Sequence, residues 1–375
     1  MNKVKNVDLI YCIAFALFVI SRILSHTTYE ISTSIKHIMT LVSVLIVVIK
    51  TILYDKLTLK EIFIYGLTLM VAVISTTKSK EYEMLCSIIF IVGAKNVSFD
   101  SIAKSYRIVA STLMVITIFL SIVGFLKENL FYRGEVLRHT FGYLYPTDFV
   151  AMTFYILLVD CFLCLKYKKN LMPRIIIYVI VSILTLILCD SRLGSLFIAL
   201  LIPVSLIIKY SKKWKTIPAV IFFEKYSLII CAMISVILVS LYIKYPSSNV
   251  IYALDSFLSF RLALTVWAVK MFGYPLLGRD IYSEFFSTKN TLWFFIDNSY
   301  YVMFIQYGML ISFIILTLFT FNNKKQLEKN NDIIPVIFSL IALNSMVGQQ
   351  LFLLEYNIFL LTLRADTRCI NEGEK

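Results

Sequence analysis

Long apolar runs separated by short polar segments dominate the hydrophobic pattern of this chain. A helix that crosses a bilayer needs roughly 20 mainly apolar residues, because each residue advances it about 1.5 Å through about 30 Å of hydrocarbon. The pattern therefore predicts about twelve transmembrane helices. Their expected limits are Val7–Leu24, Ile38–Tyr54, Glu61–Thr76, Met84–Ala94, Ile108–Leu126, Asp148–Leu165, Ile175–Cys189, Leu193–Ile208, Tyr226–Ile243, Asn298–Phe321, Ile333–Met346 and Leu351–Leu363.

The composition leads to the same class. Hydrophobic residues make up 59% of the 375 positions, charged residues make up 16%, and the mean hydropathy is +0.83. Soluble globular chains carry about a quarter charged residues. We therefore expect an all-α polytopic membrane protein, with residues 1–375 forming one integral membrane domain.

The basic residues predict the orientation of these helices. With the N-terminus inside, 23 of the 36 Lys and Arg residues fall at inner ends and 13 at outer ends. Eight of the outer ones lie in two long loops, which obey the positive-inside rule poorly, so the short loops compare 23 with five. Both termini are thus expected in the cytoplasm. We attribute the net charge of +13 to this excess of basic residues at the inner ends and to attraction to anionic lipid. A nucleic-acid partner is therefore not expected.

The two long outer loops are residues 127–147 and residues 244–297, and the second lies between the ninth and tenth expected spans. Within the second loop, Leu254–Phe272 is largely apolar with helical spacing. We expect it to form a helix that lies on the bilayer surface or dips into it. Reading it as a thirteenth span would move one flanking half of the chain to the other side and weaken the charge asymmetry.

Arginines concentrate in the first outer loop and in a short turn. Arg133, Arg138 and His139 precede a turn-rich segment, and Arg192 follows Asp190 in the connection between the seventh and eighth spans. Arginine binds phosphate through two parallel hydrogen bonds and stays charged where water is scarce. These positions predict binding of a lipid-linked phosphate. The alternatives are nonspecific contact with headgroups for the loop and a surface pair with Asp190 for Arg192.

The second outer loop combines charge with aromatic rings. It carries Arg261 and Arg279 and ends at Asp297, just before the tenth span. The Asp297 carboxylate could take a proton from a sugar hydroxyl, although its position also suits a helix N-cap. Three aromatic residues offer apolar faces to sugar rings: Trp267, Trp293 and Tyr300.

Several kinds of chemistry have no support in the residues. The chain contains no Asp-x-Asp, three histidines and no glycine-rich phosphate loop, so neither a metal nor another cofactor is expected. Cys161-x-x-Cys164 lies within a span and favours packing over metal binding. Asp160 and Glu355 also lie within expected spans, where charge is costly. They indicate either hydrogen bonding between helices or the proton coupling of a transporter.

Four stretches together resemble the superfamily of Wzy-type polysaccharide polymerases and O-antigen ligases. Each is a loose motif, and their order and topology carry the likeness, which covers roughly two-thirds of the chain. They are Arg138-His-Thr-Phe-Gly-Tyr-Leu-Tyr-Pro-Thr147, Ser191-Arg-Leu-Gly194, Arg261 through Trp267 to Pro275-Leu-Leu-Gly278, and Asp297-Asn-Ser-Tyr-Tyr301 followed by Gln306-Tyr-Gly308.

The resemblance implies a GT-C-like fold and a metal-independent glycosyltransferase that uses undecaprenyl-diphosphate-linked sugars. The family's arginines would correspond to Arg138, Arg192 and Arg261, with Arg279 and Arg133 also binding substrate. Trp267 and Tyr300 are further expected substrate contacts. Asp297 stands where ligases commonly have histidine, and this departure favours a polymerase.

The expected function is therefore polymerisation of lipid-linked repeat units into a capsular or related surface polysaccharide. The reaction would take place at the outer face of the bacterial cytoplasmic membrane. Expected partners are the bilayer, the lipid-linked glycans, a flippase and a chain-length regulator. Two alternatives stay open: a ligase that transfers the glycan to another acceptor, and a flippase or transporter of lipid-linked oligosaccharides.

Overall fold

The computed structural model of the protein describes residues 2–211, 213–288, 294–329 and 331–368. The chain divides into two units, each assembled from segments that are distant in sequence. The first unit comprises Met1–Asp55, Ile89–Thr216 and Leu354–Lys375, and the second comprises Lys56–Ile88 and Ile217–Leu353. The single domain expected from the sequence is thus built from two units.

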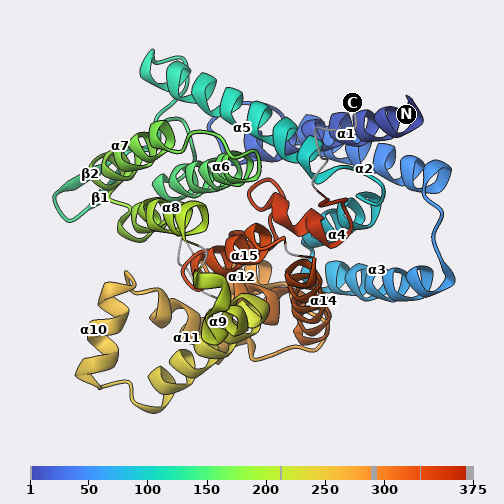
Figure 1. Ribbon diagram of the computed structural model, residues 1–375. Coiled ribbons are helices and arrows are strands. Elements are labelled where there is room, and N and C mark those ends of the chain that lie inside the picture. The colour runs from blue at the N-terminus through green and yellow to red at the C-terminus, as the bar shows by residue number, and fades with distance from the viewer. Residues whose placement is uncertain (1, 212, 289–293, 330, 369–375) are drawn as a thin grey trace. The chain divides into compact units, whose positions relative to one another are not determined.

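Eight helices of the described ranges are long and apolar enough to cross a membrane (Figure 1). This finding confirms a polytopic, predominantly α-helical membrane protein. The eight are α1 (Asn2–Ser25), α2 (Thr33–Tyr54), α3 (Leu59–Ser79), α5 (Phe99–Ile122), α6 (Pro146–Lys166), α7 (Met172–Cys189), α8 (Arg192–Tyr210) and α9 (Pro218–Lys244).

Helix α6 forms the centre of the first unit. Of its apolar stretch, 83% is buried, which is far more than in the helices around it. It contacts α5, α7 and α8, while α1 packs against α2 and α5. Gly194 lets α8 approach closely, because a Cβ at this position would lie 2.5 Å from Cγ1 of Val150 in α6.

The two acidic residues noted within the expected spans have basic partners in the first unit. Oxygens of Asp160 lie 2.7 Å from Nη1 of Arg107 and 2.8 Å from Nε of Arg174. Glu355 is buried, and its Oε1 lies 3.4 Å from Nε of Arg22 in α1. Both carboxylates therefore tie separate helical segments together.

A fully buried lysine, Lys50, lies near the C-terminal end of α2. Nζ of Lys50 lies 2.8 and 2.9 Å from the two carboxylate oxygens of Asp55, and it also donates to the carbonyls of Gly93 and Lys95. Every donor of this ammonium group is thus used. The charge is tolerated without water because the pair and the two carbonyls replace its hydration.

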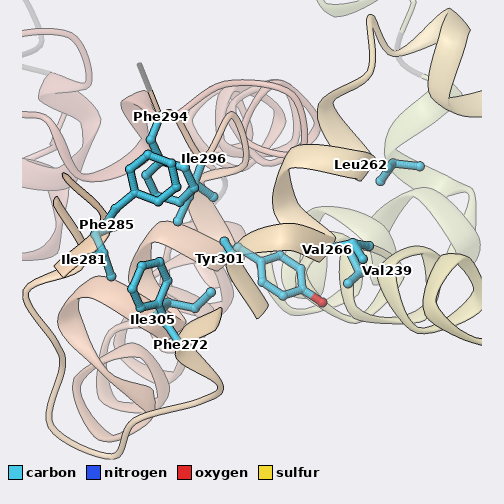
Figure 2. Close-up of a cluster of buried hydrophobic side chains, with 11 residues drawn as sticks. Val239, Leu262, Val266, Phe272, Ile281, Phe285, Phe294, Ile296, Tyr301 and Ile305 are labelled. Carbon is cyan, nitrogen blue, oxygen red and sulfur yellow. The ribbon is translucent and has the colours of Figure 1, made fainter. Parts of the chain in front are cut away.

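In the second unit, helix α9 packs against α11, α14 and α15. A buried apolar cluster that includes Phe285, Phe294 and Tyr301 joins α9 and α11 to the segments that follow (Figure 2). Further elements of this unit are α10 (Asn249–Phe257), α11 (Arg261–Phe272), α12 (Ile281–Thr288), α13 (Ser299–Tyr301), the π-helix η2 (Val302–Tyr307), α14 (Met309–Glu328), α15 (Ile333–Asn344) and the 3₁₀ helix η3 (Gln350–Phe352).

Four of the twelve expected spans differ from continuous membrane-crossing helices. The fourth and eleventh are α4 (Glu83–Gly93) and α15, whose 11 and 12 residues reach only about 17 Å. The tenth is broken into α13, η2 and α14. The twelfth forms two short 3₁₀ helices, η3 and η4 (Ile358–Leu363).

The apolar segment of the second outer loop forms two helices instead of one. Helices α10 and α11 meet at a bend of 107°, and together they could form a ninth, broken span. At the bend, Ser259 and Phe260 adopt left-handed φ angles of 60° and 61°. The buried carboxylate of Asp255 accepts a hydrogen bond of 2.9 Å from the backbone N–H of Leu262. The first turn of α11 is therefore held by a side chain from α10.

Two glycines bring the loop before α12 against the start of α14. Gly308 adopts φ 100° and ψ 158°, and a Cβ there would lie 2.3 Å from the backbone nitrogen of Gly278. The close approach lets Met309 and Leu310 donate their N–H groups to the carbonyls of Pro275 and Leu276. Donors that a helix start leaves unsatisfied are thus used by the loop.

We expect Gly308→Ala to destabilise the protein. The glycine-only backbone conformation alone costs another residue about 1–3 kcal/mol, and the overlap with Gly278 adds to this cost. Gly66→Ala is the matched control, because a Cβ there meets nothing within 4 Å and alanine favours a helix. Thermal unfolding in detergent should show a lower midpoint for Gly308→Ala than for Gly66→Ala. Equal midpoints would contradict the tight contact.

Candidate functional site

A β-hairpin carries the first group of candidate residues. Strands β1 (Phe131–Arg133) and β2 (Val136–Arg138) pair antiparallel across a two-residue turn, where Gly134 supplies a left-handed φ of 60°. The hairpin is held against the end of α7 by two hydrogen bonds. Nε of Arg138 donates to the carbonyl of Cys189 at 2.8 Å, and the His139 N–H donates to the carbonyl of Leu188 at 2.8 Å.

Asp190 organises the arginines of the first unit. It ends α7 in a left-handed conformation with φ 43°, which turns the chain sharply into α8. Its carboxylate oxygens lie 3.0 Å from Nη1 of Arg133 and 3.6 Å from Nε of Arg192. The structure therefore brings Arg133, Arg138 and Arg192 to one helix end, and the pairing of Asp190 with Arg192 expected as an alternative is present.

The balance of charge at this helix end suits an anion. Three arginines and Asp190 leave a net charge of two positive units. The Arg192 side chain is 67% exposed and that of Arg133 is 37% exposed, so both can exchange contact with Asp190 for contact with a ligand. The guanidinium groups are the exposed members of these pairs, because the Asp190 side chain is 14% exposed. The arrangement can bind a phosphate group with several donors at once.

The segment after His139 serves mainly to hold the loop in place. Gly142 has φ 81°, and a Cβ there would lie 2.9 Å from Thr117 of α5. Its carbonyl accepts a hydrogen bond from the N–H of Thr28, and Leu144 donates to the carbonyl of His26. Pro146 is the first residue of α6. The glycine and proline of this motif thus explain the position of the arginine hairpin.

Arg261 and Asp297 meet in the second unit. Nε of Arg261, the first residue of α11, lies 3.5 Å from Oδ2 of Asp297, and their side chains are 17% and 30% exposed. Asn298 caps the following helix, because its Oδ1 accepts from the N–H groups of Tyr300 and Tyr301. The alternative role of Asp297 as an N-cap is therefore filled by its neighbour. The Asp297 carboxylate is left facing a guanidinium group.

The other candidates of this unit have structural contacts. Nε of Arg279 donates to both carboxylate oxygens of Glu284, at 2.9 and 2.7 Å. Trp267 packs edge-on against Phe285, which is one of the cluster residues drawn in Figure 2. Tyr300 is fully buried and donates its hydroxyl to the carbonyl of Ala342, so this ring supports the fold and has no exposed face for a sugar. Trp293 lies outside the described residues.

Sequence reasoning missed Glu128 and the capping role of Asn298. Glu128 Oε1 lies 3.1 Å from Nδ1 of His139 and also accepts the Phe141 N–H at 3.3 Å. The signal was Gly134, because a two-residue turn at this glycine places position 128 opposite position 141 along the hairpin. For Asn298, the available signal was that asparagine is a favoured N-cap residue, although aspartate is favoured equally and Asp297 precedes it.

Comparison of the chain with protein-family models, with curated proteins and with solved structures finds no match in any of the three. The resemblance to polymerases and ligases therefore stays a prediction. In the described part of the chain, no three His, Cys, Asp or Glu side chains gather in a way that could hold a metal ion. Cys161 and Cys164 are buried, unbridged thiols within α6.

We expect the carboxylate of Asp255 to be important for the position of Arg261. Asp255→Ala would leave the buried N–H of Leu262 without its acceptor, at a cost of about 1–3 kcal/mol. Thermal unfolding should therefore start at a lower temperature. A cysteine placed at Ser259 should also react faster with a soluble maleimide.

The control is Asp280→Ala, because Asp280 likewise accepts from a helix-start N–H, that of Ser283, but its side chain is 13% exposed and Ser283 lies at the surface. Although partial burial opposes it, hydrogen bonds from Lys80 and Ser283 hold the pKa of Asp280 below its ordinary value. Water can replace these bonds, so the loss should be about 1 kcal/mol or less. An equal loss in both variants would contradict a special role for Asp255.

Proposed function

We propose that this protein is a glycosyltransferase that polymerises lipid-diphosphate-linked repeat units at the outer face of the bacterial cytoplasmic membrane. The growing glycan is transferred from its lipid diphosphate to the nonreducing sugar of an incoming repeat unit. The product is a capsular or related surface polysaccharide. The fold supports the setting of this reaction, since a polytopic membrane protein meets its lipid-linked substrate within the bilayer plane.

One observation carries the proposal: the Asp297 carboxylate faces Arg261 and is not used as a helix cap. A carboxylate beside a guanidinium group forms a pair that a diphosphate can separate. When the arginine turns to the phosphate, the carboxylate becomes available to accept a proton. Positive charge for the leaving group and a base for the acceptor are what transfer from a diphosphate requires.

The proposed reaction moves one glycosyl group and one proton. Asp297 takes the proton of the acceptor hydroxyl, and the acceptor oxygen forms a bond to the anomeric carbon of the donor. The bond from this carbon to the diphosphate oxygen breaks, and the electron pair leaves with the diphosphate. Arg261, which lies beside Asp297, stabilises the charge that develops on the leaving group, and the arginines around Asp190 bind a phosphate group of a lipid-linked substrate.

The transporter alternative has less support from the described contacts. A proton-coupled carrier needs carboxylates that exchange protons within the membrane. Asp160 lies between Arg107 and Arg174, and Glu355 lies beside Arg22. Such guanidinium partners favour permanent pairing and therefore a structural role. A ligase stays open, and reconstitution with a defined lipid-linked repeat separates the two, because polymerisation yields a ladder of products and ligation a single transfer.

We expect Arg192→Lys and Arg261→Lys each to lose most polymerase activity. A lysine keeps the charge but cannot reproduce the two parallel hydrogen bonds of a guanidinium group on a phosphate. Polymer formation by purified variants in liposomes is the measurement. Arg368→Lys is the control, because this exposed arginine pairs with Asp366 alone among the described residues. Unchanged product ladders for Arg192→Lys and Arg261→Lys would mean that both arginines only contact lipid headgroups.

Asp297→Asn tests the proposed base. The change keeps the size of the side chain and removes its basicity, and the cap on Asn298 stays in place. We expect normal thermal stability, retained binding of the lipid-linked donor and a rate lowered by about 10²–10⁴-fold. Single-turnover kinetics with defined substrates would measure the rate. A turnover equal to that of the parent would exclude Asp297 as the base.

A further inference from the structure

A buried ion pair lies within the first unit, where α5 begins and α6 ends. Nζ of Lys166 lies 2.5 Å from Oδ1 of Asp100, and the Tyr167 hydroxyl donates to Oδ2 of Asp100 at 2.8 Å. The side chains of Lys166 and Asp100 are 6% and 7% exposed. This pair fixes the position of Tyr167, the residue that follows α6.

Three further lysines gather beside Tyr167, and we call them the lysine cluster. Nζ of Lys104, in the second turn of α5, lies 4.6 Å from the centroid of the Tyr167 ring, and Nζ of Lys169 lies 6.0 Å from it. The negative face of an aromatic ring attracts cations at such distances. Nζ of Lys209, in the last turn of α8, donates to the carbonyl of Lys169 at 3.0 Å. The cluster is thus assembled from α5, α8 and the loop after α6.

The lysine cluster carries unbalanced positive charge. Asp100 already pairs with Lys166, and Asp160 is shared by Arg107 and Arg174. No member of the lysine cluster has a carboxylate partner in the described part of the chain. Ammonium groups gathered in this way repel one another. An anion that bound among them would therefore stabilise the folded protein.

The lysine cluster lies where a lipid headgroup can reach it. Helices α5, α6 and α8 are each long and apolar enough to cross a membrane, so their ends lie near the phosphates of the bilayer. Ile108 is one turn beyond Lys104 on the same face of α5, and it is 62% exposed. Tyr210, beside Lys209, is 66% exposed, as is typical of an interfacial ring. A phospholipid can therefore place its phosphate among the lysines and an acyl chain along Ile108.

We propose that the lysine cluster binds the headgroup of an anionic phospholipid, and that the Tyr167 ring assembles this site. The ammonium groups donate to phosphate oxygens, and the bound phosphates relieve the repulsion between the lysines. Three positive charges exceed the single charge of one phosphodiester, so a lipid with two phosphates, such as cardiolipin, fits the cluster best. The site belongs to the first unit alone and does not depend on the proposed glycosyl transfer.

The first measurement is the binding of cardiolipin to the delipidated protein in a neutral detergent, followed by native mass spectrometry. The double variant Lys104→Ala/Lys169→Ala should bind about 30-fold more weakly than the parent, because each lysine beside an anionic lipid contributes about 1 kcal/mol. Lys225→Ala/Lys244→Ala is the matched control. It removes the same charge from two lysines that each lie over a neighbouring tyrosine ring, and it should bind like the parent. Equal affinities of the two double variants, or no saturable binding to the parent, overturn the proposal.

Two other probes identify the ligand. Cardiolipin should raise the midpoint of thermal unfolding of the parent, whereas phosphatidylcholine and inorganic phosphate should leave it unchanged. If phosphatidylcholine has the same effect as cardiolipin, the contact is with acyl chains. If inorganic phosphate has the same effect, the cluster takes a free anion. Either result overturns a site for an anionic lipid.

Two substitutions of Tyr167 test the role of its ring. Tyr167→Phe keeps the ring and loses only the hydroxyl bond to Asp100, which retains Lys166 as a partner. Its affinity for cardiolipin should match that of the parent. Tyr167→Leu removes the ring that holds Lys104 and Lys169, and cardiolipin should bind it about tenfold more weakly. A Tyr167→Leu variant with the parent's affinity, or a Tyr167→Phe variant as weak as Tyr167→Leu, overturns the assembly of the site by the ring.

Discussion

The structure depends on one constraint: polar groups placed in an apolar solvent must find their partners within the chain. The buried ammonium group of Lys50 meets two carboxylate oxygens and two carbonyls. The same rule applies where helices end. The side chains of Asp255 and Asn298 accept hydrogen bonds from backbone N–H groups at the starts of α11 and α13. Backbone carbonyls before Gly278 do the same at the start of α14. The candidate sites lie at such helix ends, because the chain leaves regular structure only where these partners are supplied.

The sequence predicted the elements that depend on continuous apolar runs. Helices α2 and α7 end at the residues where hydropathy falls, Tyr54 and Cys189. Helix α5 begins at Phe99, nine residues before the expected start, because its first turns are polar and pair with other segments. The breaks at Phe260 and Gly308 could not be read from hydropathy. They depend on backbone conformations that long-range contacts stabilise.

The candidate residues were predicted with similar limits. The sequence placed Arg133 and Arg138 in one loop and Arg192 in a short turn. It did not predict the hairpin or the contacts with the end of α7 that bring the three arginines together. The role of Tyr300 was not accessible in this way. An aromatic residue beside a loop can face a substrate or the core, and only the packing of α13 against its neighbours decides between them.

The pairing of Glu355 with α1 has a consequence for the order in which the protein is assembled. Lys50 meets Asp55 five residues later, so its charge is compensated as soon as α2 has been synthesised. The partner of Arg22 and His26 is Glu355, which is synthesised more than 300 residues later. Until then, the end of α1 keeps its positive charge without this partner. The first unit can therefore close only after the whole second unit has been translated.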